Sequence, residues 1–135
     1  MTRAYAQQAR SLVGTRFRPQ GRSATSGLDC LGLIIASFGL DAVRARRTYR
    51  LRGDHRAELE SGLRPFFRRI WWPQAREGDM VMLKVARDQL HLAILTRGGF
   101  VHADAAIGKV VETPGRPPWP VVRAFRRRQR KPRGE

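Results

Sequence analysis

The chain of 135 residues has a single cysteine, only three histidines and no long hydrophobic run. One cysteine excludes an intramolecular disulfide framework, so packing alone must hold the fold and Cys30 is free to react. A membrane-spanning helix needs about 20 apolar residues, which no segment supplies, and residues 1–8 lack the apolar core of a secretion signal. We therefore expect synthesis in the cytoplasm without a signal peptide. So few histidine and cysteine residues predict no metal site, and we expect no organic cofactor.

Acidic residues are also scarce, with 11 Asp and Glu against 27 Lys and Arg and a formal net charge of +16. Such an excess predicts a polyanionic neighbour, which could be nucleic acid, a bacterial cell wall or a membrane surface. The arginines follow no helix-turn-helix, zinc-finger or RNA-recognition pattern, so nucleic acid is possible and not favoured. Residues 126–135 are mostly basic and predict a disordered tail.

The periodicity changes halfway along the chain. The first half predicts helices at 2–13 and 30–38, a loop at 15–27 between them, and a third helix that starts at Asp54 and ends before Trp71. The second half predicts strands over 80–85, 90–96, 100–103, 109–113 and 121–125. Helices followed by an antiparallel sheet indicate a single α+β domain over residues 1–125.

Cys30 stands at the start of an apolar, helix-like run. Asp29 precedes it and can cap the first free backbone N–H groups, and Gly39 is placed to end the helix. The partial positive charge at a helix N-terminus favours a thiolate, which predicts a nucleophile. A buried structural cysteine is the alternative, because free cysteine is among the most buried residue types.

Two histidines and an aspartate could meet this thiol. His91 lies in an apolar strand, where it is either a core histidine or a general base. Strand alternation places it on the same face as His102 and Asp104. If Gly98-Gly99 is a two-residue turn, His102 lies about 13 Å along the strand from His91, at ~3.3 Å per residue, and Asp104 is closer. The spacing leaves the choice between them open.

Four segments carry a family resemblance. Asp29-Cys30-Leu31-Gly32-Leu33 is followed by Arg76-Glu77-Gly78-Asp79-Met80-Val81, then by His91-Leu92-Ala93-Ile94 and by Gly99-Phe100-Val101-His102-Ala103. This order resembles the NlpC-type family of papain-like cell-wall cysteine peptidases. Residues 14–23 and 27–30 resemble the branch of that family that phage tails and gene transfer agents carry.

The resemblance implies a papain-like NlpC fold, with the cysteine at a helix N-terminus packed on the sheet. It also implies a cysteine endopeptidase that cuts peptidoglycan stem peptides between D-γ-glutamate and a diamino acid. Cys30 would be the nucleophile and its backbone N–H an oxyanion donor, with His91 as the general base and His102 as the residue that orients the imidazole. The residues assigned to substrate binding are Phe17, Asp29 and Asp104.

The chain departs from the family pattern at two positions. Phe17 stands where many members have a tyrosine, and Leu31 stands where many have a serine. Two hypotheses therefore remain. The favoured one is a peptidase incorporated in a phage-like particle, with tail proteins as partners, acting at the cell wall or in the periplasm. The alternative is a catalytically silent tail component or a basic nucleic-acid-binding protein.

Overall fold

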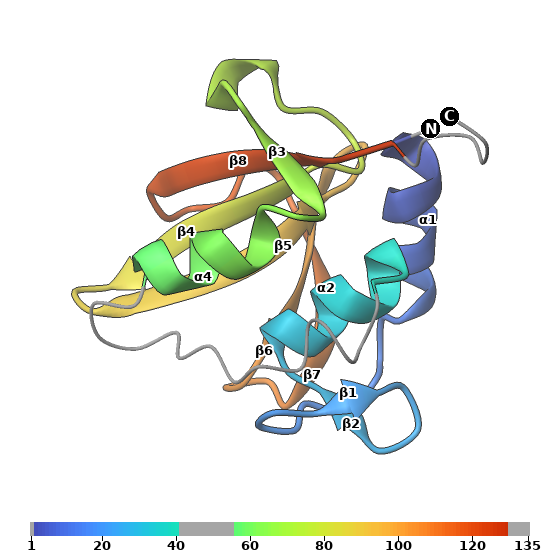
Figure 1. The fold of residues 1–135 in the computed structure, drawn as a ribbon. Helices are drawn as coiled ribbons and strands as arrows, with labels where there is room; N and C mark the ends of the chain where they lie inside the picture. Colours follow the sequence, from blue (N-terminus) through green and yellow to red (C-terminus); the bar gives the residue numbers. More distant parts are fainter. Residues whose placement is uncertain (1, 41–55, 130–135) are drawn as a thin grey trace.

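Helices and an antiparallel sheet make up the computed structural model of the chain, which describes residues 2–40 and 56–129 (Figure 1). The helices are α1 (Thr2–Ser11), α2 (Cys30–Phe38), α4 (Arg56–Leu63) and the 3-10 turn η1 (Trp72–Gln74). The sheet has the strand order β3-β8-β4-β5-β6-β7, in which neighbouring strands run antiparallel. Its strands are β3 (Phe67–Ile70), β4 (Met80–Ala86), β5 (Gln89–Leu95), β6 (Gly99–Asp104), β7 (Lys109–Pro114) and β8 (Val121–Arg127). The predicted α+β class is confirmed.

The helix that carries Cys30 is buried along almost its whole length. Its sequence is rich in Leu and Ile and contains no proline, and Asp29 caps its first turn by accepting a hydrogen bond from the Gly32 N–H. Gly39 ends it in the left-handed conformation with φ 63°, which glycine adopts without strain. The predicted bounds of this helix are confirmed, and its burial holds Cys30 rigidly against the sheet.

Both faces of the sheet are covered. One face packs against α2 through a core that includes Leu33, Ile34, Met82 and Leu92. The opposite face has a smaller core, which the loop residue Trp119 covers together with other side chains. Strand alternation therefore puts Leu92 on the helix side and Ala93 on the Trp119 side.

The third predicted helix is too long. Helix α4 ends at Leu63, and Phe67 begins strand β3 instead of extending the helical apolar face. Pro65 has no backbone N–H and its ring excludes a continuing helix, and the residues after it pair with β8. The predicted helix cap Asp54 lies outside the described residues.

The loop ahead of Cys30 and the end of the sheet also differ from expectation. Residues predicted as irregular contain a short hairpin, formed by β1 (Arg22–Ser23) and β2 (Gly27–Leu28). At the other end, β8 continues through Arg126 and Arg127, which were predicted to belong to the basic tail. Pairing with β3 orders these two residues.

The predicted turn between β5 and β6 is displaced by one residue. Leu95 pairs with Phe100, and the Thr96 N–H donates to the Gly99 carbonyl, so Arg97 and Gly98 form the turn instead of Gly98-Gly99. This register moves His102 two residues closer to His91 than the predicted one.

No helix in the described parts of the chain is both long and apolar enough to cross a membrane.

Asp79 is a buried carboxylate that links β4 to β8. It is fully buried, accepts from the Arg76 N–H, and receives hydrogen bonds of 2.9 and 2.8 Å from the Arg126 guanidinium. The Asp79→Ala variant should lose about 3 kcal/mol of unfolding free energy, because Arg126 is left without its partner in a partly buried position. Chemical denaturation measures this loss.

Glu112→Ala serves as the matched control for Asp79→Ala. Glu112 forms a mostly exposed ion pair with Arg10, so its removal should cost less than about 1 kcal/mol. Equal losses in the two variants would contradict a structural role for the buried pair.

Candidate active site

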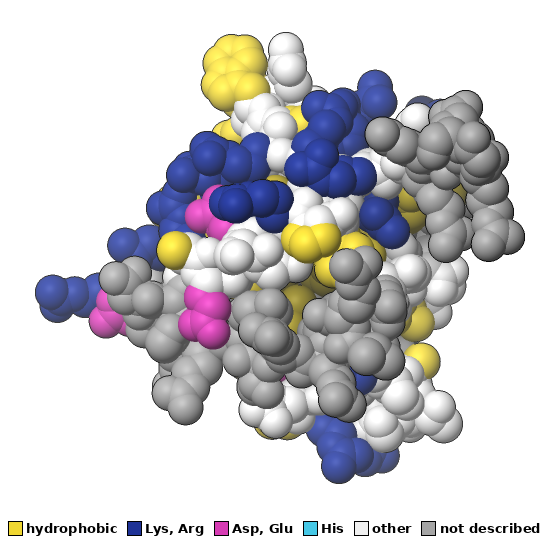
Figure 2. All heavy atoms as spheres, viewed as in Figure 1, with side chains coloured by type: hydrophobic (Ala, Val, Ile, Leu, Met, Phe, Trp, Pro, Cys, Tyr) yellow, Lys and Arg dark blue, Asp and Glu magenta, His cyan; other side chains and the backbone are white. Residues whose placement is uncertain are grey.

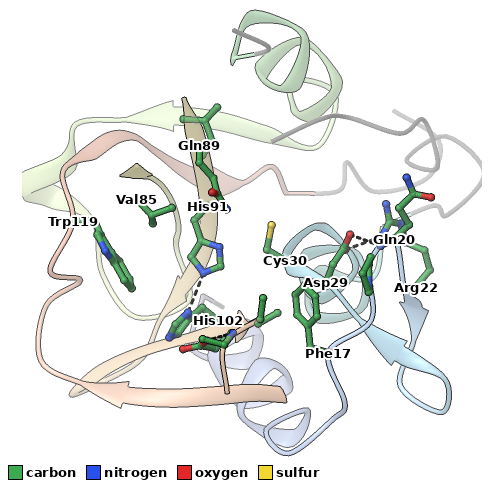
Figure 3. Close-up of a pocket in the computed structure, with 16 residues that line it drawn as sticks. Phe17, Gln20, Arg22, Asp29, Cys30, Val85, Gln89, His91, His102 and Trp119 are labelled. Carbon is green, nitrogen blue, oxygen red and sulfur yellow. Dashed lines mark hydrogen bonds and ion pairs between the residues drawn. The ribbon is translucent and has the colours of Figure 1, made fainter. Parts of the chain in front are cut away.

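A cavity of about 580 Å³ opens at the N-terminus of α2 and places Cys30 beside two histidines (Figure 3). Its walls come from the loop before α2, the start of β5, the end of β6 and the segment that follows β7. The lining side chains are Phe17, Pro19, Gln20, Arg22, Asp29, Cys30, Val85, Gln89, Leu90, His91, His102, Ala103, Asp104, Ala105, Ala106 and Trp119. The cavity therefore collects every residue that the sequence singled out for chemistry or substrate binding.

The cavity exists because β5 and β6 separate. These strands pair only at Ile94–Val101 and Leu95–Phe100, next to their turn. Towards Gln89 and Asp104 they diverge, and the N-terminal end of α2 lies at this open end of the sheet. His91, which stands on the Trp119 side of β5, thereby reaches the same cavity as Cys30 on the helix side.

One carboxylate fixes the start of α2. Asp29 accepts from the Gly32 N–H at 2.8 Å, from the Gln20 N–H at 2.9 Å and from the Arg22 guanidinium at 2.7 Å. Gly32 also packs against the Gly21 carbonyl so closely that a methyl group would not fit there. The loop and the helix are thus held together immediately beside Cys30.

The thiol of Cys30 is buried, with 3% of its surface exposed. Burial and the neighbouring Asp29 carboxylate raise the pKa of Cys30 to about 12, while backbone N–H groups of Leu92 and Leu31 and the charge of Arg22 act in the opposite direction. The expectation that the helix N-terminus would stabilise a thiolate is wrong for this site without substrate, because desolvation dominates.

His91 and His102 are joined by a hydrogen bond of 2.9 Å between His91 Nε2 and His102 Nδ1. The predicted shared face of the two residues is confirmed, and the corrected hairpin register brings them into contact. Beyond His102, its Nε2 lies 3.4 Å from the Thr113 hydroxyl on β7. When His91 Nε2 carries the proton that it donates to His102, the other ring nitrogen of His91, Nδ1, is unprotonated and available to Cys30.

Burial, followed by the proximity of His102, lowers the pKa of His91 to about 4, and the Asp104 carboxylate opposes this shift. The pKa of His102 is lowered as well, mainly by burial. Trp119 contributes to this enclosure, with its ring centroid 6.1 Å from that of His91 and 5.9 Å from that of His102. At neutral pH the free site therefore contains a thiol and two uncharged imidazoles.

The other predicted residues line the cavity in different ways. Asp104 uses Oδ1 to accept from the Ala106 and Ile107 N–H groups, so His102 and not Asp104 is the hydrogen-bond partner of His91. Asp29 is engaged within the protein as described above. Phe17 presents a half-buried ring without a hydrogen-bonding group.

Sequence reasoning missed Arg22, Thr113 and Trp119. Thr113 lies two residues beyond Val111, the β7 partner of His102, so the register of β6 and β7 would have indicated it. Trp119 comes from a proline-rich segment without periodicity, and the ion pair of Arg22 with Asp29 depends on the β1–β2 hairpin. Within the described residues, no three His, Cys, Asp or Glu side chains are grouped to bind a metal ion.

Comparisons with known proteins identify the fold. No protein-family model matches the sequence, and a search of curated proteins finds no match. A crystal structure of the NlpC/p60 domain of the peptidoglycan hydrolase SagA matches with a TM-score of 0.61 and 22% identity, covering 84% of this chain and 89% of that one. The P60 domain of antigen MAP1204 from M. avium subspecies paratuberculosis matches with a TM-score of 0.56 and 20% identity, covering 92% and 91%.

The chain therefore has the papain-like fold of NlpC/p60 domains, as the sequence motifs predicted. These structural neighbours share the fold of the family whose motifs the sequence resembles.

The lowered pKa of His91 makes stability depend on pH. The unfolded state binds a proton near pH 6.5, whereas the folded state resists protonation until about pH 4. The contribution of neutral His91 to the free energy of unfolding is therefore fully present above pH 6.5. It should fall as the pH drops towards 4, by an amount on the order of 2 kcal/mol. Denaturant titrations of wild type and His91→Gln across this range measure the effect, and parallel pH profiles would contradict it.

The charge of Asp29 should control the reactivity of the thiol. The Asp29→Asn variant keeps a residue that caps helices well but removes the negative charge that raises the pKa of Cys30. Alkylation of Cys30 at pH 8 should become about tenfold faster for each unit by which the pKa falls. The rate of alkylation is followed by mass spectrometry, with Glu112→Gln as the control variant. Equal rates in wild type, Asp29→Asn and Glu112→Gln would contradict an effect of the Asp29 charge on the thiol.

Proposed function

We propose that this protein is a cysteine peptidase that hydrolyses peptide bonds of peptidoglycan. The observation that carries the proposal is the meeting of Cys30 with the hydrogen-bonded pair His91–His102 in one cavity of an NlpC/p60 fold. One of the structural neighbours is a domain of a peptidoglycan hydrolase, which supports the same substrate class here. Fold alone does not define a reaction, so the argument depends on these three side chains.

In the proposed mechanism Cys30 attacks from its uncharged state. As Sγ bonds to the carbonyl carbon of the substrate, Nδ1 of His91 takes the thiol proton, and His102 holds the ring through its 2.9 Å hydrogen bond. The lowered pKa of His91 means that the imidazolium formed in this step is short-lived and readily gives its proton to the leaving amine. Water then attacks the thioester with His91 as base, which releases the acid and restores the thiol.

The start of α2 stabilises the negative oxygen of the tetrahedral intermediate. Cys30 is the first residue of the helix, where backbone N–H groups lack helical acceptors and the helix dipole is positive. Phe17 adds a carbon surface to the cavity and no second donor. The Cys30 N–H is therefore the main oxyanion donor in this proposal.

The bond cut is the one between D-γ-glutamate and a diamino acid. The four motifs that resemble NlpC-type peptidases support this specificity, and the 580 Å³ cavity has the size of a site for a short peptide segment. The resemblance of residues 14–23 and 27–30 to the phage-tail branch supports a place in a phage-like particle, with tail proteins as partners. Delivery by such a particle would bring a cytoplasmic protein to the cell wall or periplasm.

A catalytically silent tail component or nucleic-acid-binding protein is the second candidate. The burial of Cys30, its raised pKa and the absence of a hydroxyl at Phe17 favour it, because each lowers the reactivity of the site. The formal charge of +16 is compatible with both functions.

Digestion of purified diaminopimelate-type peptidoglycan fragments tests the peptidase. Wild type should release fragments cut after γ-glutamate and Cys30→Ala none, with His91→Ala slower by about 10²- to 10⁴-fold and His102→Ala by about 10- to 100-fold. Mass spectrometry identifies the products. Ser61→Ala, an exposed hydroxyl on α4, is the control that should keep full activity.

Two results would count against the peptidase. Identical products from wild type and Cys30→Ala would exclude Cys30 as the nucleophile. If neither protein cuts any stem peptide over a range of pH and wall types, the silent or nucleic-acid-binding candidate is favoured.

A further inference from the structure

We propose that the edge of the sheet at β3 and the end of β8 is a second, noncatalytic surface that binds peptidoglycan, an anionic polymer of the cell wall. This inference rests on the proposed function for the identity of the polymer. We call the surface the arginine edge. Its members are Arg64, Arg68, Arg69, Trp71, Arg127 and Arg128.

The arginine edge is built by adjacent pieces of chain. Strand β3 is the outer strand of the sheet, and its Phe67 and Arg68 pair with Arg127 and Arg126 of β8. Figure 2 shows Lys and Arg side chains gathered over the β3 and β8 end of the sheet. None of the members lines the catalytic cavity.

Two of these guanidinium groups are held in place. Arg128 Nε donates to the Arg64 carbonyl at 2.9 Å, and Arg127 Nη1 donates to the Phe66 carbonyl at 3.1 Å. The Arg127 guanidinium also lies over the Phe66 ring, 5.8 Å from its centroid. A charge that is held in position loses less conformational freedom when it binds a partner.

The positive charge of the arginine edge is not neutralised by the described parts of the protein. None of its five arginines forms an ion pair with a described carboxylate. Asp79, the buried carboxylate next to this end of the sheet, is occupied by Arg126, and Glu60 is occupied by Arg56 and Arg123. Arg68 stands opposite Arg126 across the two strands, and the charge of Arg126 is already balanced by Asp79.

Protection of an edge strand explains only part of this arrangement. Charged side chains on edge strands prevent pairing with other chains. That role does not require arginines on β8, which is an inner strand, or Trp71, whose surface is 69% exposed directly after β3. An exposed indole beside unpaired guanidinium groups indicates a ligand that offers both flat apolar surfaces and anions.

Peptidoglycan has both features. Its stem peptides carry carboxylates, which arginine binds through two parallel hydrogen bonds, and its sugar rings offer faces on which an indole stacks. Attachment at a second surface keeps the enzyme near an insoluble substrate and raises the effective concentration of bonds to cut. The arginine edge should therefore matter for the intact wall and not for a small soluble stem peptide.

Sedimentation with insoluble peptidoglycan tests binding apart from catalysis. Cys30→Ala is used as the parent, so that nothing is digested. Adding Arg68→Gln, Arg69→Gln and Trp71→Ala to it should weaken binding by about tenfold at moderate salt. The control pair Arg87→Gln and Lys109→Gln removes the same charge from exposed positions outside the arginine edge and should leave binding unchanged.

The same three substitutions in the protein with an intact Cys30 provide the second readout. Cleavage of intact walls should fall by about tenfold, whereas cleavage of a soluble stem peptide should stay within about twofold of wild type. If the wall-bound fraction is unchanged, or falls equally in the control pair, the proposal is wrong. It is also wrong if single-stranded DNA loses affinity for the triple variant while wall binding is retained, because the arginine edge is then a nucleic-acid surface.

Failure of the proposed function gives a different pattern. Wild type would then cut neither substrate, while Cys30→Ala would still sediment with the wall through the arginine edge. Loss of wall binding in the triple variant alone would support the surface whether or not Cys30 is a nucleophile.

Discussion

The end of the molecule that contains the Cys30 cavity depends on the carboxylate of Asp29. It caps α2 through the Gly32 N–H, anchors the preceding loop through the Gln20 N–H and pairs with Arg22 of the β1–β2 hairpin. Removing these contacts would detach the loop from the helix whose first residue is Cys30. The same charge raises the pKa of the Cys30 thiol, so the carboxylate that positions the thiol also disfavours its ionisation. Asp29 thus links the placement of Cys30 to its ionisation, and burial is the larger cause of the raised pKa.

Burial determines the protonation state of His91 and His102. His102 is almost fully buried, His91 is partly buried, and Trp119 packs against both rings. Desolvation disfavours a charged imidazole, so both rings are neutral at physiological pH. His91 can therefore accept a proton over a wide pH range.

Local patterns predicted most of the fold because they depend on neighbours in sequence. The bounds of α2 follow from Asp29, an apolar run and Gly39, and five strands follow from alternation. The third helix was overextended because Phe66 and Phe67 fit its apolar face, although Pro65 ends it and β8 offers Phe67 a strand partner. The predicted turn between β5 and β6 was one residue too far along the chain, and this error placed His102 too far from His91.

The sequence by itself determined the α+β class, the place of Cys30 at the start of a helix and the shared face of His91 and His102. These features depend on periodicity and on capping, which act within a few residues. Only the tertiary structure decided that β5 and β6 separate to admit α2, that Thr113 and Trp119 surround the histidines, and that burial outweighs the helix terminus at Cys30. Each of those depends on contacts between segments far apart in the chain, and the sum of such contacts sets desolvation.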